Sequence, residues 1–429
     1  MSVSEMFQGF LDNIKIDNAY VISLRYEEIT ASLNKKFRDT ESKTANSLQV
    51  GSYGRWTAIK GISDLDMLYI MPATKWADYK DGKQYQLLSD TKDAIKSRYP
   101  TTEVFVDRLV VRVLYKTFHV EVQPVFENSD GSFTYPDSYD DGRWKVTRPR
   151  EEIEAMTEFD ANKNKNLRRL CKMARAWKNK HGLAMGGLLI DTLAHNFLKS
   201  TSDYDDKSYT YYDWMTRDFF HYLMNEPDKD HYQALGSGQD VRVKKKFQKK
   251  AKKAYELSLK AIEAGETDAA NNKWKKIFGR PFPASASTQK AAFAEATHYW
   301  RNTEEFIEDQ YPVDIRYNLE IDCEVSQNGQ VETLLRKLLS RTIKLPPKRS
   351  LAFKVVSIDV PEPFEIKWKV LNRGDTAKQR DCIRGQIVND GGNMQRVETT
   401  DFEGDHIVEC YAIKMGVVVA KDRIRVPIQ

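Results

Sequence analysis

The sequence predicts an α+β fold that combines a mixed sheet, a helical layer and a small C-terminal β-sandwich. Three observations support this prediction. Runs rich in β-branched residues lie between residues 47 and 126, helical spacing prevails from about residue 150 to 322, and alternating apolar runs return after residue 350. The 429 residues suffice for two or three domains of roughly 100–200 residues each.

Composition and charge narrow the class of protein. With 41% hydrophobic and 30% charged residues, the chain resembles folded rather than disordered proteins. No run approaches the roughly 18 apolar residues of a membrane span, and the N-terminus lacks secretory-signal features, so we expect a cytoplasmic protein without membrane association. The four cysteines form no C-x-x-C pair, which argues against a zinc ribbon or a disulfide framework. The net charge of +5 permits a phosphate-bearing ligand without requiring one.

The first elements follow from apolar spacing. Spacings of three and four predict a long amphipathic helix from Met6 to about Phe37, interrupted near Asp17. Alternating or continuous apolar runs then predict strands, with a helix at 89–100 that ends before Pro100. The predicted strands are 66–71, 104–115 and 118–126.

The later elements divide into helices and a final set of strands. Helical spacing is followed by a Pro-, Lys- and Arg-rich linker and then by period-2 runs between turn residues. The helices are expected at 166–180, 187–199 and 243–265, and the strands at 364–372, 382–390, 406–414 and 417–428. We therefore expect a sheet domain with the N-terminal helix at 1–160, a helical domain that completes a cleft at 161–341, a linker at 342–349 and the β-sandwich at 350–429.

Two aspartates at the start of a predicted strand are the strongest chemical signal. The pattern D-x-D occurs three times, at 64/66, 203/205 and 228/230, but the last two lie in polar segments typical of solvated loops. Asp64 and Asp66 instead lead into the apolar run MLYIM, so period 2 places both carboxylates on one face of a strand while Leu65 points into the core. Two anions held this close require cations.

A third carboxylate would complete a site for two Mg²⁺ ions. Such ions take oxygen ligands and, roughly 3.5–4 Å apart, stabilise the attacking and leaving oxygens of a phosphoryl displacement. Glu121 is acidic in an otherwise apolar run and is the candidate. The alternative is an edge strand whose outward face carries His119, Glu121 and Gln123. The pairing with the two aspartates favours the metal site.

Gly51 and Ser52 lie shortly before the aspartates and follow Val50, which fits a turn at the end of a strand. Glycine allows the backbone to approach a ligand closely, and the Ser52 hydroxyl with neighbouring N–H groups could bind phosphate oxygens. A Gly-Ser pair by itself does not indicate a phosphate-binding site, and only its position before the two aspartates makes it a candidate.

These motifs together resemble a known family. Gly51-Ser52, eleven residues, Asp64-Leu65-Asp66 and the distant V-E-V-Q-P strand resemble the nucleotidyltransferase palm of the DNA polymerase beta type. With the long N-terminal helix and the segments LCKMARAWKN and GLLIDTLAHNFL, the chain is similar to the cGAS/DncV-like nucleotidyltransferases (CD-NTases) of anti-phage signalling systems. Its C-terminal segment resembles the adenylyl/guanylyl and SMODS C-terminal sensor domain.

The resemblance implies an activity and roles for particular residues. It implies a template-independent enzyme that makes a cyclic di- or trinucleotide second messenger from ATP and other nucleoside triphosphates, read by a downstream effector. Asp64, Asp66 and Glu121 would bind two Mg²⁺ ions, or Mn²⁺, and Gly51 and Ser52 would hold the donor triphosphate. Relatives often have Asp where this chain has Glu121.

Two cations on the helix at 170–179 are implied to face the triphosphate. Relatives carry Lys or Arg two positions before the tryptophan, where this chain has Arg175, and Lys172 lies one turn earlier on nearly the same side. The alternative for both residues is a solvated cation on an amphipathic helix.

The run RVKKKFQKKAKK at 242–253 holds eight cations and no carboxylate. It permits nucleic-acid binding, but the solvated face of an amphipathic helix is favoured. Two other functions remain open. One is a linear oligonucleotide synthase or RNA-tailing enzyme, and the other is a non-catalytic nucleic-acid or nucleotide sensor on the same scaffold. The C-terminal sandwich is compatible both with sensing and with simple packing.

Overall fold

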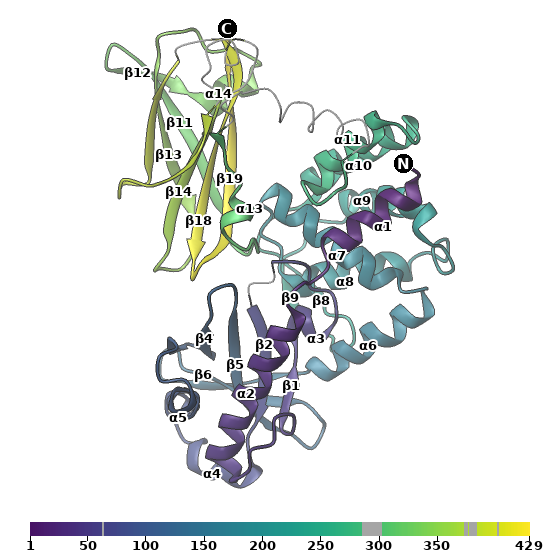
Figure 1. Cartoon of the computed structure of the whole chain (residues 1–429), viewed down its shortest axis with the longest axis vertical. Helices are drawn as coiled ribbons and strands as arrows, with labels where there is room; N and C mark the ends of the chain where they lie inside the picture. Colours follow the sequence, from purple (N-terminus) through teal and green to yellow (C-terminus); the bar gives the residue numbers. More distant parts are fainter. Residues whose placement is uncertain (62–63, 285–302, 373–375, 377–383, 401–402) are drawn as a thin grey trace. The chain divides into compact units, whose positions relative to one another are not determined.

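The computed structural model describes residues 1–429 except 62–63, 285–302, 373–375, 377–383 and 401–402 (Figure 1). The chain divides into two compact units, residues 1–180 with 185–285 and residues 181–184 with 286–429. No helix among the described residues is long and apolar enough to cross a membrane.

The first unit begins with two helices rather than one. α1 (Val3–Asn13) and α2 (Ala19–Arg38) are separated close to Asp17, as the sequence predicts. Their buried faces meet different partners. Phe7 of α1 packs at 5.2 Å, ring centre to ring centre, from Trp274 in α11 (Asp268–Phe278), whereas the buried side chains of α2 join the core of the sheet. The N-terminal helix expected for the sheet domain is thus shared between sheet and helical layer.

The palm is a seven-stranded mixed sheet in which β2 and β5 are parallel neighbours. The predicted run 104–115 forms a hairpin rather than one strand, because Arg108 takes a positive φ of 50° at its tip. The predicted helix at 89–100 lies in α5, which begins earlier and ends before Pro100. The strands are β1 (Ser47–Gln49), β2 (Asp64–Ile70), β3 (Val104–Asp107), β4 (Val110–Leu114), β5 (His119–Glu127), β6 (Phe133–Asp137) and β7 (Arg143–Thr147).

The two faces of this sheet differ, and the difference positions the site. One face is covered by α2 and α5 (Gln84–Arg98), whose apolar side chains pack on Leu65, Met67 and Val120. Because side chains alternate along a strand, residues 64, 66 and 121 must point to the opposite face. The short helices α3 (Gly51–Gly54), η1 (Ala73–Lys75) and α4 (Trp76–Tyr79) connect strands of the palm.

The helical layer confirms the predicted helices, with one shorter than expected. The predicted helix at 243–265 begins only at Gln248, after a short hairpin and a loop. The elements are α6 (Pro149–Asn162), α7 (Asn166–His181), α8 (Gly187–Lys199), η2 (Tyr209–Tyr211), α9 (Tyr212–Asn225), β8 (His231–Gln233), β9 (Asp240–Arg242), α10 (Gln248–Glu263) and α11.

The second unit is a β-sandwich, which confirms the predicted class of fold. Two four-stranded sheets, in the orders β12-β11-β13-β17 and β16-β14-β18-β19, share one apolar core that includes Phe353 and Trp368. The strands are β11 (Leu319–Gln327), β12 (Gln330–Leu334), β13 (Ser350–Ile358), β14 (Glu365–Leu371), β16 (Ile387–Asn389), β17 (Gln395–Thr399), β18 (Gly404–Lys414) and β19 (Val417–Ile428). The short elements β10 (Thr303–Glu304), α13 (Ile307–Gln310), α14 (Leu335–Ser340) and β15 (Arg384–Gly385) complete it. Residues 382 and 383 of the strand expected at 382–390 lie outside the described residues.

The sandwich begins earlier in the chain than the sequence predicts. Residues 319–334, predicted to belong to the helical domain, form β11 and β12, and β11 pairs with β13. The alternately buried residues Ile321, Cys323 and Val325 give this stretch the period of a strand. The expected linker at 342–349 lies inside the sandwich unit, where the Leu345 side chain is buried and its N–H donates to the Pro427 carbonyl.

Candidate active site

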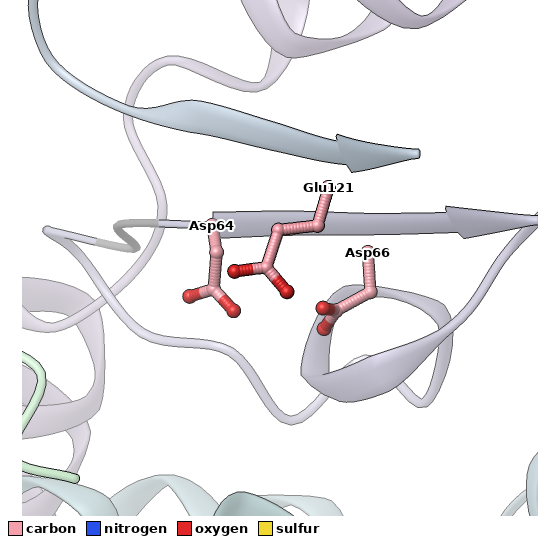
Figure 2. A group of neighbouring side chains, drawn as sticks. All are labelled: Asp64, Asp66 and Glu121. Carbon is pink, nitrogen blue, oxygen red and sulfur yellow. The ribbon is translucent and has the colours of Figure 1, made fainter. Parts of the chain in front are cut away.

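The three predicted acidic residues meet on the face of the palm sheet opposite to α2 and α5. Asp66 and Glu121 are direct neighbours across the parallel pair β2 and β5, and Asp64 lies two residues earlier on the same face as Asp66. One carboxylate oxygen from each residue lies within 4.8 Å of one from each of the others, and Figure 2 shows the three carboxylates grouped together. β5 is hydrogen-bonded to β2 and β4, so the edge-strand alternative for Glu121 is wrong.

Two basic side chains contact the carboxylate of Glu121. The Arg112 Nη2 lies 3.1 Å from Glu121 Oε1, and its Nε lies 2.8 Å from an Asp107 oxygen. His119 Nε2 lies 3.3 Å from the same Glu121 oxygen. These contacts restrain the Glu121 side chain.

The glycine–serine turn lies directly against Asp66. Gly51 begins α3 with φ of 63°, and a Cβ at this position would lie 1.8 Å from Asp66 Oδ2. The Val50 N–H donates to the Asp66 carbonyl at 2.9 Å. The absent side chain of Gly51 therefore allows the turn to reach the acidic group. The structure brings Gly51, Ser52 and the three carboxylates into one neighbourhood.

Lys172 and Arg175 lie on α7 in different environments. Lys172 is half-buried and makes no hydrogen bond or ion pair with any residue that the structure describes. Burial, assisted by the positive charge of Arg168, lowers the pKa of Lys172. Arg175 is 5% exposed, and its guanidinium group binds both carboxylate oxygens of Asp191, at 2.5 and 3.0 Å. The triphosphate contacts implied for these two cations remain predictions.

Sequence reasoning missed the carboxylate that binds Arg175. Asp191 is the single acidic residue in the apolar run GLLIDTLA, and an isolated charge in the buried face of a helix is the signal that could have revealed it. Glu152 of α6 and Arg55, which follows the turn directly, belong to the same buried group.

Comparison with known proteins identifies both units. Residues 1–160 match the Second Messenger Oligonucleotide or Dinucleotide Synthetase domain, and residues 301–429 match the Adenylyl/Guanylyl and SMODS C-terminal sensor domain. The chain is a CD-NTase with a C-terminal sensor domain. This CD-NTase thus combines a nucleotidyltransferase domain with the β-sandwich described above.

Individual relatives agree with this assignment. The chain is 23% identical over 311 residues to a cyclic AMP-AMP-AMP synthase of an Acinetobacter species, covering 69% of this chain and 90% of the relative. It is 22% identical over 273 residues to a probable cyclic nucleotide synthase of Bacillus cereus, covering 54% and 81%. The fold is shared with Escherichia coli CdnC, solved in complex with HORMA, at a TM-score of 0.52 and 14% identity over 65% of this chain and 98% of that one.

Proposed function

We propose that this CD-NTase makes a cyclic di- or trinucleotide from ATP and other nucleoside triphosphates, releasing pyrophosphate. The observation that carries the proposal is the acidic group of Asp64, Asp66 and Glu121 on parallel strands, with the Gly51 turn directly against it. The cyclic product is supported by the names of the two relatives, a cyclic AMP-AMP-AMP synthase and a probable cyclic nucleotide synthase. We further propose that the enzyme acts in the cytoplasm. Its product would be a signal in anti-phage defence that a downstream effector reads.

The donor atoms of the acidic group fit hard divalent cations. All three ligands are carboxylate oxygens, and those are the ligands that Mg²⁺ and Mn²⁺ prefer. We assign two Mg²⁺ ions to Asp64, Asp66 and Glu121, with Mn²⁺ as an alternative. When bound, such ions activate an attacking hydroxyl and neutralise charge on the leaving group.

The chain's own residues supply positioning. We assign the Ser52 hydroxyl and N–H groups of the turn as hydrogen-bond donors to the donor triphosphate, because both belong to the short helix that begins at Gly51. Lys172 offers a half-buried positive charge that forms no ion pair with a described residue, although the charge of Asp160 acts on it. Positioning and charge stabilisation are the main contributions that a protein makes to phosphoryl transfer. The same site would act twice, with the linear intermediate turning to become the acceptor in ring closure.

Nucleic-acid binding by the basic run is not part of the proposal. Within this run, Phe247 and Ala251 are buried while Lys249, Lys252 and Lys253 are exposed. This is the pattern of an amphipathic helix with a solvated cationic face.

Product analysis tests the proposal. The full-length protein is incubated with all four nucleoside triphosphates and Mg²⁺, treated with phosphatase, and its products are analysed by mass spectrometry. We expect a phosphatase-resistant cyclic product and pyrophosphate release. A phosphatase-sensitive product would instead indicate a linear synthase. No pyrophosphate from any mixture, together with salt-sensitive binding of DNA or RNA, would indicate a non-catalytic sensor.

A further inference from the structure

A buried ionic network lies immediately behind the glycine–serine turn. Arg55, the first residue after α3, is 4% exposed. Its Nε donates to Asp191 Oδ2 at 2.9 Å and its Nη1 to Glu152 Oε2 at 3.0 Å. The Thr57 hydroxyl donates to the same Asp191 oxygen at 3.1 Å. Two of the first three side chains after the turn therefore contact one carboxylate.

Asp191 also holds the helix that carries Lys172. The bidentate contact from Arg175 fixes α7 to α8, and Lys172 lies three residues before Arg175 on α7. Burial opposes ionisation of Asp191, but the charges of Arg175 and Arg55 outweigh it and hold its pKa below the usual value. One ionised, fully buried carboxylate thus joins both parts of the proposed triphosphate site.

The backbone between these contacts is strained. Trp56 has a positive φ of 61°, which is rare for a bulky residue, and its side chain is 71% exposed. Its neighbours Arg55 and Thr57 are both buried and bonded to Asp191, and Arg168 Nε donates to the Arg55 carbonyl at 3.1 Å. Such a conformation persists only where the surroundings fix it. Here the ionic network fixes the conformation of residues 55–57, which follow the turn.

We infer that Asp191, with Arg55 and Arg175, is a positioning group that sets the glycine–serine turn and Lys172 in register for the triphosphate. The inference rests on the proposed function, because that function supplies the triphosphate. On this inference, Arg175 does not contact the triphosphate. Its role is to orient α7 from the interior of the protein. Lys172 is then the cation of this helix that contacts phosphate.

The test compares two buried aspartates of the same unit. Asp191→Asn removes the charge at the centre of the network. Asp137→Asn is the matched control, because Asp137 of β6 is also fully buried and held by basic side chains, Arg108 at 2.8 Å, Arg143 at 3.2 Å and Lys145 at 2.7 Å, none of which belongs to the turn or to α7. Thermal unfolding measures the loss of stability in both variants, so that a general structural effect is visible.

Two readouts separate positioning from stability. For Asp191→Asn we expect KM and Kd for ATP to rise about ten-fold, with a smaller fall in kcat. We also expect hydrogen exchange at the amides of Gly54, Arg55 and Thr57, which close the turn, to become about ten-fold faster. Asp137→Asn should lower the melting temperature and leave ATP affinity and these amides within about two-fold of wild type.

Milder variants cover the case in which Asp191→Asn does not fold. Thr57→Val removes only the hydroxyl that binds Asp191, and Arg55→Lys keeps the charge but loses the fork that reaches both Asp191 and Glu152. We expect ATP affinity to weaken by about three-fold and five-fold, respectively, with the fold retained.

The inference is overturned if the folded variants keep wild-type ATP affinity and exchange rates, or if Asp137→Asn changes both as much as Asp191→Asn does. Product formation by the wild-type protein tests the proposed function separately. If wild type binds ATP and Asp191→Asn weakens that binding, but no cyclic product forms, the proposed function fails and the positioning role stands.

Discussion

The acidic group on the palm gathers side chains of like charge, whereas the ionic network behind the turn pairs side chains of opposite charge. In the acidic group, Asp64, Asp66 and Glu121 place like charges within 4.8 Å of one another. In the network, two arginines alternate with two buried acids, so opposite charges neutralise each other. Like charges held together repel one another, and the ion pair of Arg112 with Glu121 offsets only part of the three carboxylate charges, whereas removing one member of a neutral buried network leaves a charge unpaired. The first arrangement suits a ligand and the second suits a scaffold.

The largest expected effect is in the acidic group. Asp66→Asn or Asp64→Ala should lower pyrophosphate release by at least about 1,000-fold, since each removes a proposed metal ligand. Without metal, Asp66→Asn should keep or gain up to about 1 kcal/mol of unfolding free energy, because it relieves repulsion. Asp191→Asn should instead lose about 3 kcal/mol.

Calorimetry checks this contrast. Mg²⁺ should raise the melting temperature of wild type and of Asp191→Asn, but much less that of Asp66→Asn, because only a bound ligand stabilises the folded state. A folded Asp66→Asn protein with wild-type turnover would remove the metal assignment. A large loss of metal-free stability in the same variant would show that the acidic group is a structural element, and the contrast would disappear.

Gly51 is the residue at which the turn contacts the acidic group. Gly51→Ala therefore tests how closely the turn and the acidic group depend on each other. The new Cβ would collide with Asp66, and we expect turnover to fall about 100-fold through displacement of a metal ligand. Gly82→Ala is the control, because Gly82 has a similar φ of 68° with nothing within 4 Å of its Cβ position. Both variants share the backbone strain. Equal loss of activity in the two would show that strain, and not the contact with Asp66, is responsible.

Substitution of Lys172 is expected to have a smaller effect on catalysis than substitution of Gly51. Lys172→Met should raise KM for ATP about ten-fold with little loss of stability, since a half-buried charge without an acidic partner among the described residues is removed. Because burial lowers its pKa, Lys172 loses its proton as pH rises, at a lower pH than an ordinary lysine. ATP affinity of wild type should therefore weaken as pH increases through that lowered pKa.

The pH profile of ATP affinity measures this effect. In Lys172→Met the alkaline loss of affinity should be absent, and in the control Lys199→Met, which changes an exposed residue of α8, it should remain. An unchanged KM in Lys172→Met would indicate that Lys172 does not contact the triphosphate.

The smallest effect is expected at the basic run. Replacing Lys249, Lys252 and Lys253 with alanine should leave basal product formation within about two-fold of wild type, because exposed cations outside the site contribute little to catalysis. Product formation with and without added RNA or DNA, at low and physiological salt, is the measurement. Stimulation by nucleic acid that the triple variant loses would make this surface a regulatory site.

Local patterns were sufficient to predict the acidic group. Asp64 and Asp66 face the same side because side chains alternate along a strand, and Leu65 is buried as that alternation requires. The position of Gly51 was also predictable, but its reason was not. The contact that excludes a Cβ comes from Asp66, fifteen residues later in the sequence, and depends on how β2 lies beside the turn.

The errors came from elements whose partners the sequence pattern does not reveal. The hairpin within 104–115 is hidden because both its strands are apolar, and residues 319–334 belong to the sandwich because β11 pairs with β13, about thirty residues further on. α1 packs on Trp274 and not on the palm. In each case the local pattern of apolar residues does not identify the partner of the element.

By itself, the sequence determined the family motifs, the strand that carries two carboxylates and the acidic third residue, because each depends on the order of neighbouring residues. Tertiary structure alone decided that Arg175 is bound by a buried aspartate while Lys172, three residues away, has no such partner among the described residues. Arg55 and Asp191 are 136 residues apart. The role of a cation depends on which anion the fold brings to it, and that information is spread over the whole unit.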